Sequence, residues 1–220
     1  MLRRIVRIIV RALFQILTRF EVQGLDHIPR QGGLLIAVNH LSRFDPPALF
    51  SVIERQDLSA LVADKYKSHP LIRPVVNFVK GIWIHREDTD FHALRKATEY
   101  LQSGGILGIA PEGTRSTERG LIAAKTGVAY LADKGGVPVL PVAFIGTDMV
   151  VESWRRLRRP RVQVRIGEPF RLPPLERKTR AVQMQENTDA IMLRIAAMLP
   201  PEYRGVYAED PRLKALPESP

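Results

Sequence analysis

The amino-acid sequence predicts a single α/β domain with a mixed, largely parallel central sheet that is flanked by helices. Its 220 residues suit one domain with a substantial core, and its hydrophobic share of 45% is ordinary for a globular protein. Short, continuous apolar segments indicate strands that are buried on both faces. Segments with helical periodicity lie between them, and this alternation is typical of α/β domains.

Residues 1–20 are predicted to form a basic amphipathic helix ahead of the main domain, which we place at residues 21–203. Arg3, Arg7 and Arg11 recur every four residues, and mostly apolar residues lie between them. Two interpretations fit: an anchor in the surface of an anionic membrane, which we favour, or a helix packed on the domain with its basic face in water. Arginines interrupt every apolar stretch, so the segment suits neither a spanning helix, which needs about 20 apolar residues, nor a secretory signal.

Six strands and three helices are predicted in the rest of the chain. The strands are the apolar segments at residues 33–38, 58–63, 81–85, 106–110, 137–144 and 161–166. The helices span residues 90–102, 121–134 and 176–198, and each is followed by a glycine pair or a proline pair that ends it. The tail at residues 204–220 is polar and contains proline, so we expect it to be loosely ordered.

The net charge of +10 predicts an anionic partner. Apart from the N-terminal helix, most of the excess lies at residues 154–180, which include the arginine-rich segment at residues 154–161. Nucleic-acid binding is one interpretation of such a segment, but Trp154 is its single aromatic residue and no recognised nucleic-acid motif accompanies it. We therefore favour a second patch for lipid headgroups, with Trp154 at the membrane interface, and expect no nucleic acid as a partner.

A histidine and an aspartate follow the predicted strand at residues 33–38. His40 and Asp45 lie five residues apart, close to the carboxyl end of the strand, where open α/β sheets bind their ligands. A turn at this point can bring the Asp45 carboxylate to His40 Nδ1, which fixes the tautomer that leaves Nε2 able to accept a proton. The pair is a candidate general base, although on spacing alone a structural pair is the commoner alternative.

A second motif, Pro-Glu-Gly-Thr-Arg-Ser at residues 111–116, follows the predicted strand at residues 106–110. Its proline and glycine favour a tight turn that exposes backbone N–H groups, and Arg115 carries a planar guanidinium suited to a phosphate. The alternative is a surface turn with a solvated arginine. Arg86, which follows the strand at residues 81–85, is a second candidate phosphate ligand.

Together these motifs resemble those of the glycerolipid acyltransferase family, which includes bacterial 1-acylglycerol-3-phosphate acyltransferases. His40 and Asp45 match the family's His-X4-Asp motif, and residues 111–116 carry its Pro-Glu-Gly-Thr-Arg-Ser motif intact. The family's glycine-to-arginine block is similar to Gly-Ile-Trp-Ile-His-Arg at residues 81–86, and its proline-containing strand to Val-Pro-Val-Leu-Pro-Val at residues 137–142. The resemblance extends over residues 20–170 and appears in the family's order of motifs.

The resemblance implies the glycerolipid acyltransferase fold and transfer of a fatty acyl chain to the sn-2 hydroxyl of 1-acylglycerol 3-phosphate, which gives phosphatidic acid. The donor would be acyl-CoA or an acyl carrier protein thioester, and His40, oriented by Asp45, would be the general base. The resemblance also implies a substrate site made of Lys65, Arg86, Glu112, Gly113, Thr114 and Arg115. Since a carboxylate does not favour a phosphate, we expect Glu112 to order its loop or to contact a cationic neighbour.

The implied partners are anionic membrane lipids, a lysophospholipid acceptor and the acyl donor, with the protein on the cytoplasmic face of the cell membrane. Another lysophospholipid, a lyso-aminolipid or glycerol 3-phosphate is an alternative acceptor. A membrane adaptor without enzymatic activity is a further alternative, but it leaves the two motifs unexplained.

Other kinds of chemistry have little support in the sequence. There is no cysteine, so no thiol nucleophile is available, and Ser42 lacks the Gly-X-Ser-X-Gly surroundings of a serine nucleophile. The five histidines are dispersed, so we predict no metal, and no cofactor besides the thioester co-substrate. His85 is expected to be structural or to face solvent rather than to act as a second base.

Overall fold

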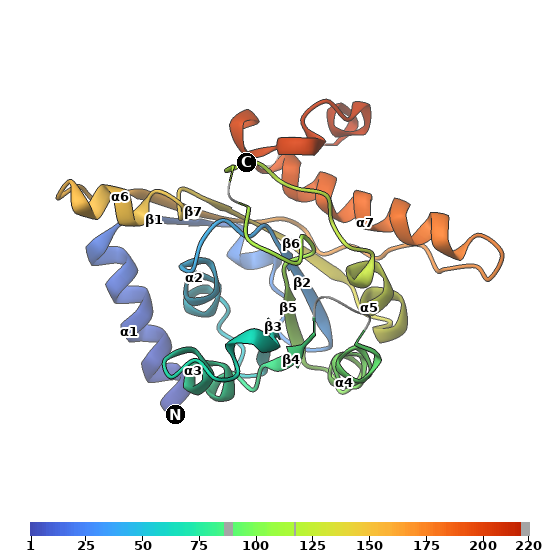
Figure 1. Ribbon diagram of the computed structural model, residues 1–220, viewed down its shortest axis with the longest axis horizontal. Helices are drawn as coiled ribbons and strands as arrows, with labels where there is room; N and C mark the ends of the chain where they lie inside the picture. The colour runs from blue at the N-terminus through green and yellow to red at the C-terminus, as the bar shows by residue number, and fades with distance from the viewer. Residues whose placement is uncertain (86–89, 117, 217–220) are drawn as a thin grey trace.

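The structure, a computed structural model, describes residues 1–85, 90–116 and 118–216. Within these residues a sheet of seven strands has the order β1-β7-β6-β2-β5-β3-β4 (Figure 1). Neighbouring strands are parallel, except for β6 and β7, which are antiparallel. The predicted α/β class with a mixed, largely parallel sheet is therefore confirmed.

The strands are β1 (Arg19–Gln23), β2 (Leu34–Val38), β3 (Leu58–Ala63), β4 (Ile82–Ile84), β5 (Ile106–Ile109), β6 (Val139–Ile145) and β7 (Arg161–Ile166). The helices are α1 (Leu2–Leu17), α2 (Asp45–Val52), α3 (Ile72–Phe78), α4 (Phe91–Gln102), α5 (Gly127–Gly135), α6 (Val150–Arg155) and α7 (Arg180–Ala197). All six predicted strands are present, and their ends lie within two residues of the prediction.

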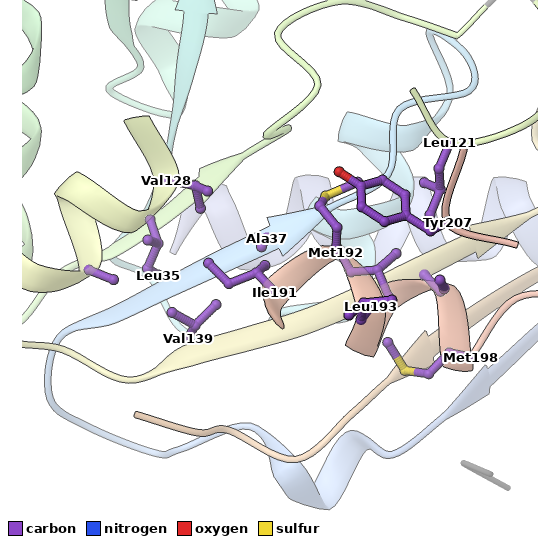
Figure 2. Close-up of a cluster of buried hydrophobic side chains, with 14 of the residues drawn as sticks. Leu35, Ala37, Leu121, Val128, Val139, Ile191, Met192, Leu193, Met198 and Tyr207 are labelled. Atoms are coloured by element: carbon purple, nitrogen blue, oxygen red, sulfur yellow. The ribbon is translucent and has the colours of Figure 1, made fainter. Parts of the chain in front are cut away.

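Helices cover both faces of the sheet. In Figure 1, α1, α2 and α3 lie on one side of it, and α4, α5 and α7 lie on the other. Successive side chains of β2 alternate between the two resulting cores: Leu35 and Ala37 pack beneath α5 and α7, whereas Leu34 and Ile36 pack beneath α2. Figure 2 shows the first of these cores, with Ile191 of α7 close to β2. Burial on both faces explains why the strand is apolar throughout.

Three helices have bounds that differ from the prediction by three residues or more, and one of them, α7, begins at Arg180 rather than at residue 176. Helix α5 begins at Gly127 rather than at Leu121, because the preceding loop bonds to other parts of the chain: Leu121 N donates to Tyr203 O, and Lys125 N donates to Pro111 O. At the N-terminus, α1 ends at Leu17, and the chain turns into β1, which pairs with β7. The helix is therefore three residues shorter at this end than the predicted helix at residues 1–20.

The C-terminal segment packs on α7 through short 3₁₀ turns at Gly205–Tyr207 and Pro211–Ala215. Tyr207 and Leu213 are buried in the core beneath α7, and Figure 2 shows Tyr207 beside Leu121. This differs from the loosely ordered tail that the composition indicated. The polar composition of the whole segment does not reveal that Tyr207 and Leu213 hold it on the domain.

Helix α1 is amphipathic and packs on the domain. Two of its arginines face the protein, whereas the packed alternative considered above had the basic face in water. Arg7 is buried and donates hydrogen bonds to the carbonyl oxygens of Phe50, Glu54 and Arg55, at the end of α2 and just beyond it. Burial lowers the Arg7 pKa, and the three carbonyl contacts satisfy the guanidinium. Arg3 similarly donates to carbonyl groups, including that of Leu58.

The opposite side of α1 is apolar and exposed. Its large exposed side chains are Leu2, Ile5, Ile8, Ile9, Leu13, Ile16 and Leu17. Two arginines of the predicted basic face therefore hold the helix on the protein, and an apolar stripe faces outward. No helix in the described part of the chain is both long and apolar enough to cross a membrane.

Candidate active site

His40 and Asp45 meet just beyond the carboxyl end of β2. His40 Nδ1 lies 2.8 Å from Asp45 Oδ2, and the Asp45 side chain is only 2% exposed. The pair forms because α2 begins at Asp45, with prolines at the next two positions that suit the first turn of a helix. The short loop between β2 and α2 folds the carboxylate back onto the ring, as the sequence analysis predicted.

Asp45 Oδ2 accepts two further hydrogen bonds, from the backbone N–H groups of Leu41 (2.8 Å) and Ser42 (2.7 Å). The carboxylate also lies in the first turn of α2, where the helix dipole favours negative charge. An oxygen held in this way acts as an acceptor, so the bond to His40 requires a proton on Nδ1. His40 Nε2 is then the ring atom that accepts a proton.

Glu112 organises the backbone around His40. Its Oε1 accepts from the N–H of His40 (3.0 Å), and its Oε2 accepts from the N–H of Ile122 (3.1 Å). The side chain is buried, and this burial raises the pKa of the Glu112 carboxyl. The expectation that Glu112 orders its loop agrees with these contacts. Both of its oxygens bond to the protein's own backbone, and its place among the substrate-binding residues stays a prediction.

Asn39 joins β2 to β6 immediately before the histidine. Its side-chain amide donates to Phe144 O (2.9 Å) and accepts from Phe144 N (2.7 Å), and the residue is fully buried. On the other side, Ser116 N donates to His40 O (2.9 Å). His40 is thus held through its ring, both of its backbone polar groups and the residue before it.

A groove of about 360 Å³ lies beside His40, and its lining includes Leu41, the next residue in the chain. Its walls come from the loop before α2, from the loop after β5 and from the turn between β6 and α6. Arg43 and Arg115 line it, and both side chains are exposed. Arg119 also lines it, and its Nε forms an ion pair of 2.8 Å with Asp148.

Gly113 forms the turn of the Pro-Glu-Gly-Thr-Arg-Ser loop. Its φ of 70° lies in the left-handed region, which glycine adopts without strain. A Cβ at this position would lie 3.2 Å from side-chain carbons of Lys125, so the turn also passes close to that lysine. Thr114 is exposed next to it. The loop therefore has the tight turn that its sequence predicted.

Lys65, another predicted substrate-binding residue, does not line this groove. Lys65 follows β3 and is exposed, with its Nζ 5.4 Å from the centre of the Tyr66 ring. Arg86 lies outside the described residues. His85 follows β4, and its Nδ1 lies 2.9 Å from Asp64 Oδ2, so it forms a second histidine–aspartate pair at the same edge of the sheet.

A family model described as Acyltransferase matches residues 19–145, which is more than half of the chain. The chain belongs to the acyltransferase family. The matched region runs from β1 to the end of β6 and contains both the His40–Asp45 pair and the loop with Arg115. The resemblance that the sequence motifs indicated is confirmed.

Curated relatives of this acyltransferase are 1-acyl-sn-glycerol-3-phosphate acyltransferases. The chain is 26% identical to one from Chlamydomonas reinhardtii over 198 residues, which is 87% of this chain but 56% of that protein. It is 22% identical to one from Bacillus subtilis over 175 residues, which is 80% of this chain and 85% of that protein.

The fold is similar to that of the 1-acyl-sn-glycerophosphate (LPA) acyltransferase PlsC from Thermotoga maritima. The TM-score is 0.66 at 22% identity, and the match covers 88% of this chain and 78% of that chain. At this identity the likeness concerns the fold.

Sequence reasoning missed three features of the acyltransferase site: Asn39, Lys125 and the turn at Thr147. Asn39 directly precedes His40, and a polar residue at the end of a wholly buried strand is a signal that it bonds to a neighbouring strand. Lys125 and Thr147 give no such local signal, since the fold brings them to the loops around His40. Within the described residues, no three histidine, aspartate or glutamate side chains converge to hold a metal ion.

Proposed function

We propose that this protein transfers a fatty acyl chain from an acyl thioester to the sn-2 hydroxyl of 1-acylglycerol 3-phosphate. The observation that carries the proposal is the His40–Asp45 pair, whose carboxylate is buried and accepts three hydrogen bonds beside a groove lined by arginines. The names of the relatives support the choice of acceptor. Acyl-CoA and acyl carrier protein are both candidate donors.

In the proposed reaction, His40 Nε2 accepts the proton of the sn-2 hydroxyl while the hydroxyl oxygen attacks the carbonyl carbon of the thioester. Asp45 stabilises the imidazolium that forms and keeps the ring oriented. The carbon–sulfur bond then breaks, and the leaving thiolate takes the proton from His40. The products are phosphatidic acid and a free thiol, and no acyl-enzyme is formed.

The acceptor's phosphate is proposed to lie in the groove next to His40. Arg43 and Arg115 are exposed there and bring two positive charges to a dianionic group. Arg119 contributes less charge, because Asp148 neutralises it. This arrangement favours an acceptor with a phosphate over an uncharged glyceride.

We propose further that the protein docks on a membrane through the outward side of α1. Ile9 and Ile16 belong to its exposed apolar stripe, with 53% and 66% of their surface accessible. A stripe of this kind suits the boundary between headgroups and acyl chains. The segment after α6 approaches the end of the same helix, where Arg159 donates to Gln15 O and Thr18 O.

The activity is tested by presenting 1-acylglycerol 3-phosphate in anionic vesicles and measuring thiol release and the lipid product. Acyl-CoA and acyl carrier protein thioesters are supplied in turn, and a panel of other lysophospholipids and glycerol 3-phosphate is compared. The proposal expects phosphatidic acid as the main product. A folded, vesicle-bound protein that releases no thiol with either donor and any acceptor would disprove it.

Membrane docking is tested by vesicle co-sedimentation of an Ile9→Glu/Ile16→Glu double variant. Removing each apolar contact is expected to weaken binding by about tenfold. Val182→Glu/Val206→Glu is the matched control, because both valines are exposed but lie on α7 and near the C-terminus. Equal binding by the two double variants would place the membrane contact elsewhere.

A further inference from the structure

We propose that Leu157, in the turn between α6 and β7, inserts into the membrane, and that arginines of the same turn bind anionic lipid headgroups. The inference rests on the proposed function, of which membrane docking is a part, and adds a second contact to that of α1. It is carried by the backbone conformation of Leu157, by the exposure of its side chain and by the position of the turn.

Helix α6 ends in a Schellman motif, and Leu157 occupies the left-handed position of this motif. Leu157 N donates to Trp154 O at 2.9 Å. Arg158 N donates to Ser153 O, also at 2.9 Å. The Leu157 φ of 53° lies in the left-handed region, where glycine is the usual residue because a Cβ is unfavourable there. A leucine at this position therefore makes the free protein less stable than a glycine would.

Packing within the protein does not offset this strain. The Leu157 side chain is 98% exposed, and among the large apolar side chains of the described residues Met1 alone is more exposed. A residue that is strained and almost fully in water contributes nothing favourable to the folded state. Strained residues of this kind point to a function. For an apolar side chain, that function is contact with an apolar environment outside the chain.

The turn is basic as well as apolar. Arg155 and Arg158 lie close to Leu157 in the chain and are exposed. Arg156 pairs with Glu152 at 2.7 Å, so it adds little net charge. Arg155 and Arg158 are therefore the main sources of positive charge beside the leucine. This combination suits an anionic membrane, because the leucine reaches the acyl chains while the arginines remain among the phosphates.

The turn lies next to the exposed apolar stripe of α1. In Figure 1, α6 and the segment after it lie beside the end of α1. Trp154 Nε1 donates to Leu17 O at 2.9 Å, and Ile16 and Leu17 both belong to the stripe. The Trp154 N–H is thus used within the protein, which makes Leu157 the better candidate for insertion. Because the two apolar surfaces are neighbours, a membrane is favoured over a protein partner.

The first test measures binding to anionic vesicles that contain neither acyl donor nor acceptor. Leu157→Asn removes the apolar side chain but keeps a residue that tolerates the left-handed conformation, so binding is expected to fall by about tenfold. Val182→Asn is the matched control, because Val182 is exposed on α7. Arg155→Gln/Arg158→Gln is expected to weaken binding to anionic vesicles by about tenfold or more and to change binding to neutral vesicles little.

Thermal unfolding without vesicles separates this role from a role in folding. Leu157→Gly is expected to unfold at the same temperature as the wild type or higher, because glycine adopts the left-handed conformation without strain. It is also expected to bind vesicles about tenfold more weakly, as Leu157→Asn does. A purely structural residue would not combine these two results. A lower unfolding temperature for Leu157→Gly would overturn the inference.

Insertion is measured directly with Leu157→Trp and vesicles whose acyl chains carry bromine, which quenches tryptophan fluorescence. We expect more quenching than in the wild type, whose two tryptophans are Trp83 and Trp154. Val182→Trp, the matched control, should add fluorescence that the bromine does not quench. An unquenched indole in Leu157→Trp, or equal vesicle binding by Leu157→Asn and Val182→Asn, would overturn the inference.

Kinetics distinguish a membrane from a protein partner. Unchanged vesicle binding by Leu157→Asn, together with a higher KM for an acyl carrier protein thioester, would assign the turn to that protein and overturn the inference. Because the vesicles of the binding assay contain no substrate, the proposed function can fail separately. A wild type that binds through Leu157 but releases no thiol would disprove the proposed reaction and support the inference.

Discussion

The described part of the chain contains two histidine–aspartate pairs at the same edge of the sheet, and the two pairs differ in burial rather than in contact geometry. The ring contacts are almost equal, 2.8 Å for His40–Asp45 and 2.9 Å for His85–Asp64. Both histidines also donate their backbone N–H to a second carboxylate, Glu112 in the first case and Asp90 in the second. Contact geometry alone does not distinguish the two pairs.

Burial does distinguish them. The side chains of His40 and Asp45 are 19% and 2% exposed, whereas those of His85 and Asp64 are 46% and 33% exposed. The second carboxylates show the same contrast: burial raises the pKa of Glu112, and hydrogen bonds from Ala93 and His85 lower the pKa of Asp90. Water screens an exposed pair, while a buried pair keeps both its orientation and its electrostatic strength. The comparison supports His40, rather than His85, as the proposed base.

The largest difference in kcat between the two pairs is expected when each histidine ring is removed by substitution with alanine. His40→Ala should lower kcat by about a thousandfold or more, because the acceptor hydroxyl loses its base. His85→Ala should change kcat by less than about threefold, since a screened surface pair contributes little. Both variants are assayed for thiol release under saturating substrate, with vesicle binding as the control for folding. Similar losses in the two variants would contradict the assignment.

Asparagine at the two aspartate positions is expected to give the next largest difference. Asp45→Asn should lower kcat by about a hundredfold, because the amide stabilises an imidazolium less well and places N–H groups beside backbone donors. Asp64→Asn should leave kcat within about twofold of the wild type. The acceptor KM should change little in either variant. A large fall in kcat for Asp64→Asn would show that the second pair takes part in the reaction.

A third contrast concerns stability. Both oxygens of Glu112 accept backbone N–H groups, so in Glu112→Gln one N–H faces an amide donor, and the free energy of unfolding should fall by about 1–3 kcal/mol. Asp90→Asn should cost under about 1 kcal/mol, because asparagine also caps a helix well and the site is near water. Urea unfolding of both variants measures this. Equal losses of unfolding free energy in the two variants would mean that burial of the Glu112 carboxylate adds nothing to stability.

The sequence predicted the α/β class, all of the central parallel strands and the His40–Asp45 pair, because these features depend on local patterns. A strand that is buried on both faces is visible as a continuous apolar run in the sequence. His40 and Asp45 are five residues apart, so a single turn brings their side chains into contact. β1 was missed, since it is only partly buried and its pairing with β7 joins residues that are far apart in the chain. No local pattern specifies such a partner.

Orientation was harder to predict than helix formation. The periodicity of α1 was visible in the sequence, but a helical wheel does not show that Arg7 points toward the carbonyl groups at the end of α2. Lys125 was missed for a related reason. Its closeness to the turn at Gly113 depends on the path of the loop before α5, which no local pattern in the sequence specifies.

The smallest expected effect is a pKa change in the exposed pair. The hydrogen bond from His85 is the main reason that the pKa of Asp64 lies below its ordinary value. His85→Ala should therefore raise the Asp64 pKa toward its ordinary value, which carboxyl NMR titration measures. A lowered pKa in the folded state contributes stability above the unfolded value, and this contribution is lost as the pH falls through the folded value. The variant should thus lose less stability than the wild type on acidification below about pH 4. An Asp64 pKa that does not move in His85→Ala would show that water already screens the contact completely.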